Sequence, residues 1–164
     1  MIILGLDPGL ATLGYGVIEV IGNKNKIVDY GIIETGSKTS FPRRLVQVSE
    51  GVVDLLTKFG PDSVAIEELF FSKNVKTAIN VAHARGVTLV EVAKVMDEVY
   101  EYTPLQVKQA VVGYGRAEKK QVQQMVKVLL NLKDIPKPDD AADALAVALC
   151  HAHTKNMQSA FKIK

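Results

Sequence analysis

What the sequence lacks excludes several classes of protein. The chain has 164 residues but a single cysteine, Cys150, which excludes a disulfide framework and a cysteine-based zinc site. No apolar run approaches the roughly 20 residues that a membrane-spanning helix needs, and no basic segment precedes the first apolar run, so we expect neither a membrane anchor nor a signal peptide. We therefore predict a cytoplasmic protein with one folded domain over residues 1–155 and a flexible tail over residues 156–164.

The small net charge of +2 conceals an uneven distribution of charged residues along the chain. Residues 104–133 carry six basic side chains and one acidic side chain, whereas acidic residues are in excess over residues 61–103. A basic block of this kind is typical of a surface that faces a polyanion. A solvent-exposed helix face gives the same pattern, so the charge alone leaves both interpretations open.

The apolar patterns predict an α/β fold. Strands over residues 2–6, 14–21 and 27–35 are separated by polar turns and form an antiparallel meander. A helix over residues 41–59 leads to a fourth strand over residues 63–68, which a helical connection places parallel to the first strand. The other predicted elements are a strand over residues 99–103 and helices over residues 74–98, 104–112, 117–132 and 139–153. We expect a five-stranded mixed sheet with helices on both faces.

The helix predicted over residues 74–98 has more apolar residues than one stripe can hold. A helix with two apolar faces needs two partners, and we expect these to be the sheet and a second copy of the chain. The small residues that would let two copies approach closely are Ala78, Ala82, Ala84 and Gly86. The alternative is a monomer that buries both faces of the helix.

Four acidic residues are predicted to meet at one edge of the sheet. Asp7 ends the first strand and Glu67 ends the fourth, and the carboxyl ends of parallel strands are where open sheets place their sites. Asp140 and Asp143 are three residues apart on the last helix, so they share a face. Each acid alone could be a turn residue, a helix cap or half of an ion pair. Together they predict a carboxylate cluster.

A carboxylate cluster of this kind requires cations. Two carboxylates about 5 Å apart repel each other by roughly 3 kcal/mol at an effective dielectric constant of 20. Ligands that are all oxygen atoms favour Mg²⁺ or Mn²⁺, and His151 and His153, two residues apart on a helix, point to different faces. Beside a basic surface, such a site indicates hydrolysis of phosphodiester bonds by a pair of metal ions.

Five segments of the sequence, in order, resemble the RuvC family of crossover (Holliday) junction endodeoxyribonucleases. They are GLDPGLATLGYGVIE, IEELFFSKN, ARGV, YTPLQVKQAVVGYGRAEKKQVQQMV and PDDAADALAVALCHAH. The resemblance covers residues 1–153. It implies a ribonuclease-H-like fold, a homodimer and two Mg²⁺ ions per active site, for which Mn²⁺ can substitute. It also implies paired symmetric nicks in strands of like polarity at a four-way DNA junction, in recombination and repair, with the RuvA–RuvB branch-migration complex as a partner.

The resemblance assigns the acidic tetrad of the family to Asp7, Glu67, Asp140 and Asp143. Some members carry histidine at the position of Asp140, and Asp139 is an additional acid beside it. The third metal ligand is therefore either Asp139 or Asp140.

The resemblance also assigns residues that contact DNA. Phe70 matches an aromatic residue of the family, and its ring could stack on a base exposed at the centre of a junction. Lys108 and Lys119 match lysines implicated in catalysis or junction binding, and a lysine near the cleaved phosphate would offset developing negative charge. Weaker candidates for contacts with the DNA backbone are Lys73, Lys76, Arg85, Arg116 and Lys120.

Three alternative functions each disagree with a feature of the sequence. A nuclease of the same fold that acts on RNA, of the YqgF type, would lack the Phe70 loop and the basic block in this form. A junction-binding module without catalysis would have no reason to keep four acids facing DNA. An actin-like sugar kinase needs two domains of this size, and 164 residues hold only one.

Overall fold

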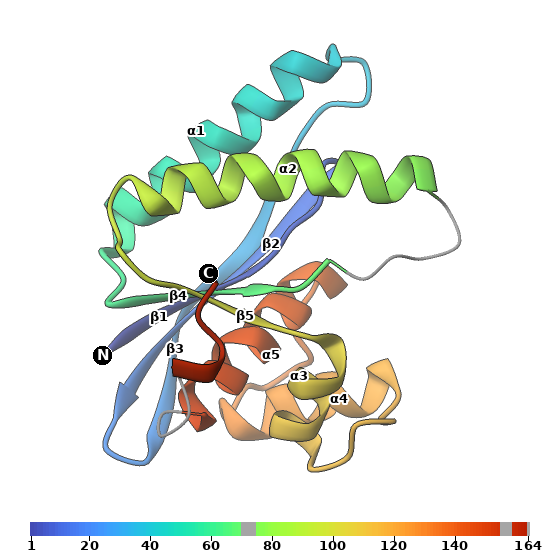
Figure 1. Cartoon of the computed structure of the whole chain (residues 1–164). Helices are drawn as coiled ribbons and strands as arrows, with labels where there is room; N and C mark the ends of the chain where they lie inside the picture. Colours follow the sequence, from blue (N-terminus) through green and yellow to red (C-terminus); the bar gives the residue numbers. More distant parts are fainter. Residues whose placement is uncertain (70–74, 155–158, 164) are drawn as a thin grey trace.

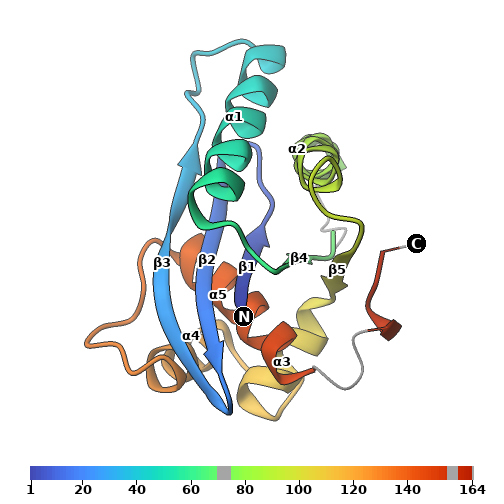
Figure 2. The same ribbon diagram turned by 90° about the vertical axis from the view of Figure 1, so that its left-hand side faces the viewer.

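The structure is a computed structural model that describes residues 1–69, 75–154 and 159–163, apart from the side chains of residues 75 and 76. It has three layers, with one sheet between two layers of helices (Figures 1 and 2). None of the helices in the described ranges is long and apolar enough to cross a membrane.

The sheet has five strands in the order β3-β2-β1-β4-β5. They are β1 (Ile2–Asp7), β2 (Thr12–Ile21), β3 (Lys24–Glu34), β4 (Ser63–Glu67) and β5 (Val99–Tyr102). The first three strands are antiparallel, and β4 and β5 run parallel to β1. The central strand β1 has four consecutive buried residues, as expected for a strand covered on both faces. The mixed sheet predicted from the sequence is confirmed.

Two helices cover one face of the sheet, α1 (Phe41–Phe59) and α2 (Val75–Ala93) (Figure 2). The apolar stripe of α1 packs against the buried side chains of β1, β2 and β4. It consists of Val48, Val52, Leu55 and Leu56. Gly60 ends α1 with a φ of 49°, a left-handed conformation that glycine adopts without steric cost. The bounds of α1 agree with the sequence prediction.

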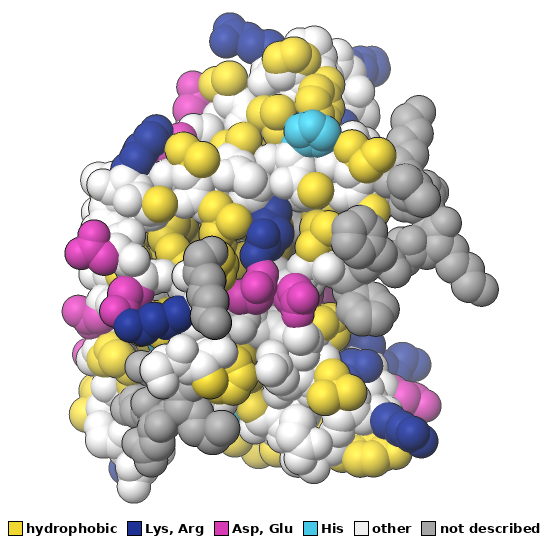
Figure 3. Space-filling view, viewed as in Figure 1, with side chains coloured by type: hydrophobic (Ala, Val, Ile, Leu, Met, Phe, Trp, Pro, Cys, Tyr) yellow, Lys and Arg dark blue, Asp and Glu magenta, His cyan; other side chains and the backbone are white. Residues whose placement is uncertain are grey.

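The second helix, α2, is shorter than predicted and keeps an apolar face exposed. It ends at Ala93 and not at residue 98, because residues 94–98 must turn the chain into β5. Ile79 and Val90 remain 50% and 56% exposed. Hydrophobic side chains are visible over the region of α1 and α2 in the space-filling view (Figure 3). The described residues of α2 thus have one packed face and one uncovered apolar face.

Three helices cover the opposite face of the sheet, namely α3 (Pro104–Val112), α4 (Lys119–Leu129) and α5 (Asp139–His153). Helix α5 is almost entirely buried in the core. All of its residues from Ala141 to Ala152 are buried except Asp143. It packs on β1 and β2 and is covered in turn by α3 and α4.

The C-terminal end of the chain pairs with the outer edge of β5. The backbone N–H of Glu101 donates to the carbonyl of Phe161 at 2.8 Å, and the N–H of Ile163 donates to the carbonyl of Val99 at 2.9 Å. These residues belong to the segment over residues 156–164, for which a flexible tail stays a prediction of the sequence. The pairing satisfies backbone groups that an edge strand would otherwise leave exposed.

Candidate active site

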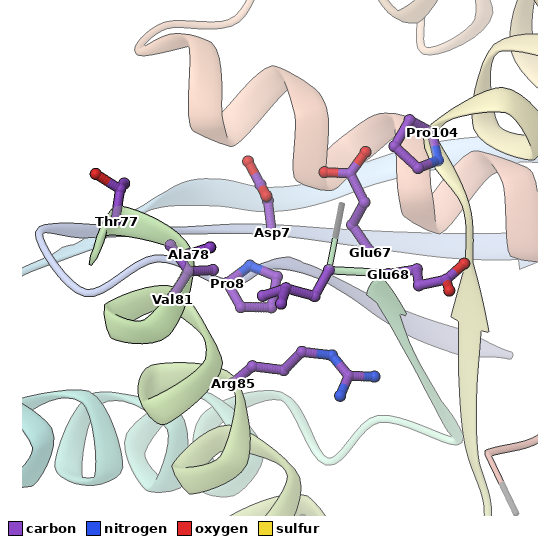
Figure 4. A pocket seen from close by; sticks show the side chains of 10 residues that line it. Asp7, Pro8, Glu67, Glu68, Thr77, Ala78, Val81, Arg85 and Pro104 are labelled. Carbon is purple, nitrogen blue, oxygen red and sulfur yellow. The ribbon is translucent and has the colours of Figure 1, made fainter. Parts of the chain in front are cut away.

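The sheet brings Asp7 and Glu67 to the same edge. The parallel register of β1 and β4 pairs Leu6 with Ile66, so the next residue of each strand lies at the carboxyl end of the sheet. The two carboxylates point to the same side, whereas Glu68 points away from them (Figure 4). This is the arrangement that the sequence predicts for the first two acids.

The start of α5 brings Asp140 and Asp143 to this edge through a close contact with β2. Gly14 of β2 pairs with Asp7 across the antiparallel ladder. A Cβ atom at Gly14 would overlap the carbonyl oxygen of Asp140, so the absence of a side chain lets the backbone of α5 lie directly against the strand. The sequence analysis did not identify this contact, although a glycine inside a predicted strand was a signal for it.

Gly14→Ala is expected to lower the free energy of unfolding by about 1–3 kcal/mol, because the added methyl group must push α5 away from β2. The matched control is Gly86→Ala in α2, where a Cβ atom would meet no other atom within 4 Å. Denaturant unfolding of both variants measures the difference. Equal stability of the two variants would contradict the close contact.

Burial and mutual repulsion raise the pKa values of the carboxylates, because too little positive charge lies near them. The pKa of Asp7 is raised to about 9, mainly by burial and then by the nearby negative charges of Glu67, Asp143 and Asp140 and by a hydrogen bond with Glu67. The pKa of Glu67 is also raised by burial, although the hydrogen bond from Asp7 opposes the shift. Asp7 therefore keeps a proton at neutral pH and donates it to Glu67. A pair that shares a proton in this way is poised to exchange it for a cation.

Lys119 is the cation nearest to Asp143 in this structure. The backbone N–H of Glu118 donates to the side chain of Gln121 at 2.8 Å, and α4 begins directly after it, at Lys119. The Nζ atom of Lys119 lies 2.8 Å from Oδ2 of Asp143 and 3.3 Å from Oδ2 of Asp139. Burial raises the pKa of Asp143, and the hydrogen bond from Lys119 acts against that shift.

Asp139 and Asp140, between which the sequence left the choice open, have different surroundings in the structure. Asp139 is 63% exposed on its side chain and also accepts a hydrogen bond of 3.0 Å from Nε2 of Gln123. Its contacts are therefore with α4. Asp140 instead adds to the negative charge around Asp7. This favours Asp140 as the third acid of the cluster.

The basic residues predicted to act with the acids lie beside them. Lys108 and Lys119 line a cavity of 220 Å³ together with Glu67 and Asp143. Arg116, in the connection between α3 and α4, and Lys120, in the first turn of α4, are exposed.

Other predicted contacts with DNA are placed differently or lie outside the described residues. Arg85 of α2 forms an ion pair with Glu101 of β5, so its charge is already compensated. Phe70 and Lys73 lie outside the described residues, and so does the side chain of Lys76.

His151 anchors α5 to the sheet, a role that the sequence analysis missed. It is fully buried, and its Nε2 and Nδ1 atoms lie 2.7 Å from the hydroxyl of Ser63 and 2.8 Å from the hydroxyl of Tyr102. Burial lowers its pKa to about 4, so the ring is neutral at physiological pH. The contacts fix the position of α5, and with it the acids at its start, relative to β4 and β5.

The donor set of the cluster fits a divalent metal ion. All four acids offer oxygen atoms, which hard cations prefer, and the raised pKa values of Asp7, Glu67 and Asp143 show negative charge that is not fully compensated. Within the described residues, no three ligand groups yet surround a common point. Asp7 contacts Glu67 and Asp143 contacts Lys119, and a divalent cation would replace both contacts.

Comparisons with known proteins give matches over most of the chain. The family model described as "Crossover junction endodeoxyribonuclease RuvC" matches residues 3–151. A relative of that name from Alkaliphilus metalliredigens is 62% identical over 164 residues, which is 100% of both chains. The solved structure of Thermus thermophilus RuvC has a TM-score of 0.91 and 37% identity, covering 99% of this chain and 100% of that chain. T. thermophilus RuvC in complex with Holliday junction substrate has a TM-score of 0.93 and 38% identity, covering 99% of each.

Proposed function

The chain belongs to the RuvC family of crossover junction endodeoxyribonucleases, and on this premise we propose that it resolves four-way (Holliday) DNA junctions by hydrolysing phosphodiester bonds. The observation that carries the proposal is the negative charge of Glu67, Asp143 and Asp140 around the buried Asp7, next to a cavity that Lys108 and Lys119 line. An acidic cluster facing DNA would weaken binding unless metal ions neutralised it, which argues against a module that only binds junctions.

The proposed cofactor is Mg²⁺, with two ions per active site and Mn²⁺ as a possible substitute. Asp7, Glu67, Asp140 and Asp143 would hold the ions. When bound, such ions lower the pKa of the attacking water and stabilise the leaving oxygen. Asp7 must lose its proton to become a ligand, and the positive charge of the ions favours that loss.

The basic residues act on the DNA in this proposal. Lys119, freed from Asp143, directs its ammonium group toward the negative charge that develops on the cleaved phosphate. Lys108 lines the same cavity and adds to that positive potential. Backbone contacts are proposed for Arg116 and Lys120 and, from the sequence, for Lys73 and Lys76. Stacking of Phe70 on an exposed base is likewise carried over from the sequence.

A homodimer is proposed through the apolar groove between α1 and α2. This groove has a volume of 650 Å³, and its lining includes Val46, Ile79 and Val90, which are 39–56% exposed. Of the four small residues singled out in the sequence, only Ala82 and Gly86 line the groove, because Ala78 and Ala84 are buried within the fold. A two-fold axis through this surface would present two identical sites to a junction of matching symmetry, as paired nicks in strands of like polarity require.

Ile79→Glu combined with Val90→Glu is expected to convert the dimer into a monomer, because two carboxylates would be buried on each side of an apolar interface. Sedimentation measures the mass, and a cruciform plasmid reports paired nicks as linear product and single nicks as open circles. The double variant should give open circles. Val95→Glu, at a residue 65% exposed outside the groove, is the control and should stay dimeric. A dimeric double variant would rule out this interface.

The experiment that tests the function compares a mobile synthetic four-way DNA junction with a linear DNA duplex and an RNA hairpin. Each is incubated with the protein and either Mg²⁺ or EDTA, and the nicks are mapped. Symmetric nicks in the junction alone, only with Mg²⁺, are expected. Binding without cleavage would favour the binding module, and cleavage of the RNA would favour the RNA-acting alternative. Partnership with RuvA–RuvB and a cytoplasmic location stay predictions of the sequence.

A further inference from the structure

A second cavity opens at the edge of the acidic cluster, on the side away from the two lysines. Its volume is 320 Å³, within the range of ligand pockets. The turn between β1 and β2 (residues 9–12), Arg44 of α1, residues of α2 and Asp140 line it. The cavity of Lys108 and Lys119 lies toward β5 and shares no lining residue with it. The two cavities therefore flank the acids in opposite directions along the sheet edge.

Arg44 is fixed in this cavity by a hydrogen bond at one end of its guanidinium group. Its Nε atom donates to Oγ1 of Thr35 at 2.8 Å, and that hydroxyl donates to the carbonyl of Leu10 at 2.5 Å. Thr35 is 4% exposed, and its backbone N–H donates to the carbonyl of Ala11 at 3.0 Å. The side chain is thus tied to the β1–β2 turn that lines the cavity.

The charge of Arg44 is not compensated by a nearby acid. Among the described residues, no carboxylate lies within 4.0 Å of its guanidinium nitrogens, in contrast to Arg85, which is paired with Glu101. An arginine held through Nε presents its two terminal nitrogens as a fork that matches the oxygens of a phosphate group. Its position makes it an anion-binding group beside a site that is otherwise acidic.

The walls of the cavity suit a nucleic-acid backbone. The β1–β2 turn is tight because Gly9 lacks a side chain. A Cβ atom there would overlap the carbonyl oxygen of Thr12 at the other end of the turn. Polar side chains that line the cavity include Thr12 and Asn80. A DNA strand whose cleaved phosphate lies at the acids must continue in both directions, and one of these directions leads along the side of β2 to the cavity of Arg44.

We propose that Arg44 binds a phosphate of the cleaved strand next to the one that is hydrolysed, and so positions that strand over the acidic cluster. The inference rests on the proposed junction-cleaving function and adds a positioning residue to it. Arg44 does not contact the acids and takes no part in the chemical step.

The first test measures junction binding at several salt concentrations for the wild type, Arg44→Ala and Arg44→Lys. Arg43→Ala is the matched control, because Arg43 is the preceding residue and is exposed. Loss of one phosphate contact should lower the slope of log K against log salt concentration by about one. Arg44→Ala should weaken binding about ten- to a hundredfold, while Arg44→Lys should retain the slope with lower affinity. A slope for Arg44→Ala equal to that of Arg43→Ala would overturn the proposal.

The second test removes the negative charge of one DNA phosphate at a time. Junctions with a single neutral methylphosphonate, placed at each position around the cleavage site in turn, are cleaved by the wild type and by Arg44→Ala. At one position next to the cleaved bond, the wild type should lose activity and the variant should lose nothing further, because both changes remove the same contact. Fully additive losses at every position would refute the contact.

Two controls separate this inference from other causes. Unfolding midpoints are measured for every variant, and a loss of binding that follows the loss of stability alone would assign Arg44 a structural role. Thr35→Val removes the hydroxyl that holds Nε but keeps the charge, so its salt slope should match the wild type. Failure of the wild type to cleave any junction would refute the proposed function itself, whereas an active wild type with an unaffected Arg44→Ala variant would refute only this inference.

Discussion

Asp7→Asn is expected to abolish junction cleavage while leaving junction binding nearly intact. The substitution keeps the shape of the side chain but removes a negative oxygen from the proposed metal site, and metal ions contribute several kcal/mol to such reactions. Single-turnover cleavage should therefore fall by about a thousandfold or more. Binding should persist because the basic residues that we propose to contact the DNA backbone are unchanged. Electrophoretic mobility shift assays measure the binding on the same junction.

The matched control for Asp7→Asn is Glu68→Gln. Glu68 lines one cavity together with Asp7 and Glu67 and also carries a carboxylate. It is exposed, however, and points away from Asp7 and Glu67 (Figure 4). Its substitution should leave cleavage close to the wild-type rate. Undiminished cleavage by Asp7→Asn, or an equal loss in both variants, would show that the acidic cluster is not the active site.

Without divalent cations, the protein is expected to lose stability as the pH rises through the neutral range. The pKa of Asp7 is raised from 3.8 to about 9 in the folded state, mainly by burial, and the pKa of Glu67 is raised as well. Between those two values the folded state binds more protons than the unfolded state. The contribution of these two groups to stability is therefore greatest below their unfolded pKa values and falls with rising pH, by at most about 1.4 kcal/mol per pH unit for each group.

Thermal unfolding between pH 7 and 9, in EDTA and in Mg²⁺, measures this effect. The window avoids the lower range where His151 titrates, since burial lowers its pKa to about 4 and destabilises the fold on the acid side of 6.5. The unfolding temperature should fall with pH in EDTA, and Mg²⁺ should raise it most at pH 9. Asp7→Asn removes the titrating group and should flatten the EDTA curve. A wild-type curve in EDTA as flat as that of the variant would contradict the buried, proton-sharing pair.

Local patterns were sufficient to predict most of the secondary structure. Helix α1 was predicted with its observed bounds because its apolar spacing is periodic and Gly60-Pro61 ends it. The parallel pairing of β1 with β4 followed from the helical connection between them, and it placed Asp7 beside Glu67. The bounds of a helix depend on neighbouring residues, and the relative direction of two strands depends on the type of connection between them, so both can be predicted from the sequence.

Contacts between distant segments were not predictable in this way. The pairing of the C-terminal end with β5, the ion pair of Arg85 with Glu101 and the link from Arg44 through Thr35 to the β1–β2 turn join segments far apart in the chain or of different type. No local sequence pattern predicts which two of these residues will be in contact. They arise only once the sheet order and the helix packing are set.

The sequence by itself determined the strand and helix types and the resemblance to one nuclease family, and it predicted that Asp7, Glu67 and Asp143 belong to one acidic cluster. Only the tertiary structure decided that Asp139 pairs with Lys119 while Asp140 lies near Asp7, because adjacent residues on a helix point in directions that its packing must fix. It also decided which face of α2 stays uncovered and that Arg44, unlike Arg85, has no carboxylate within 4.0 Å among the described residues. Both depend on which surfaces are already buried, and burial is a property of the whole fold.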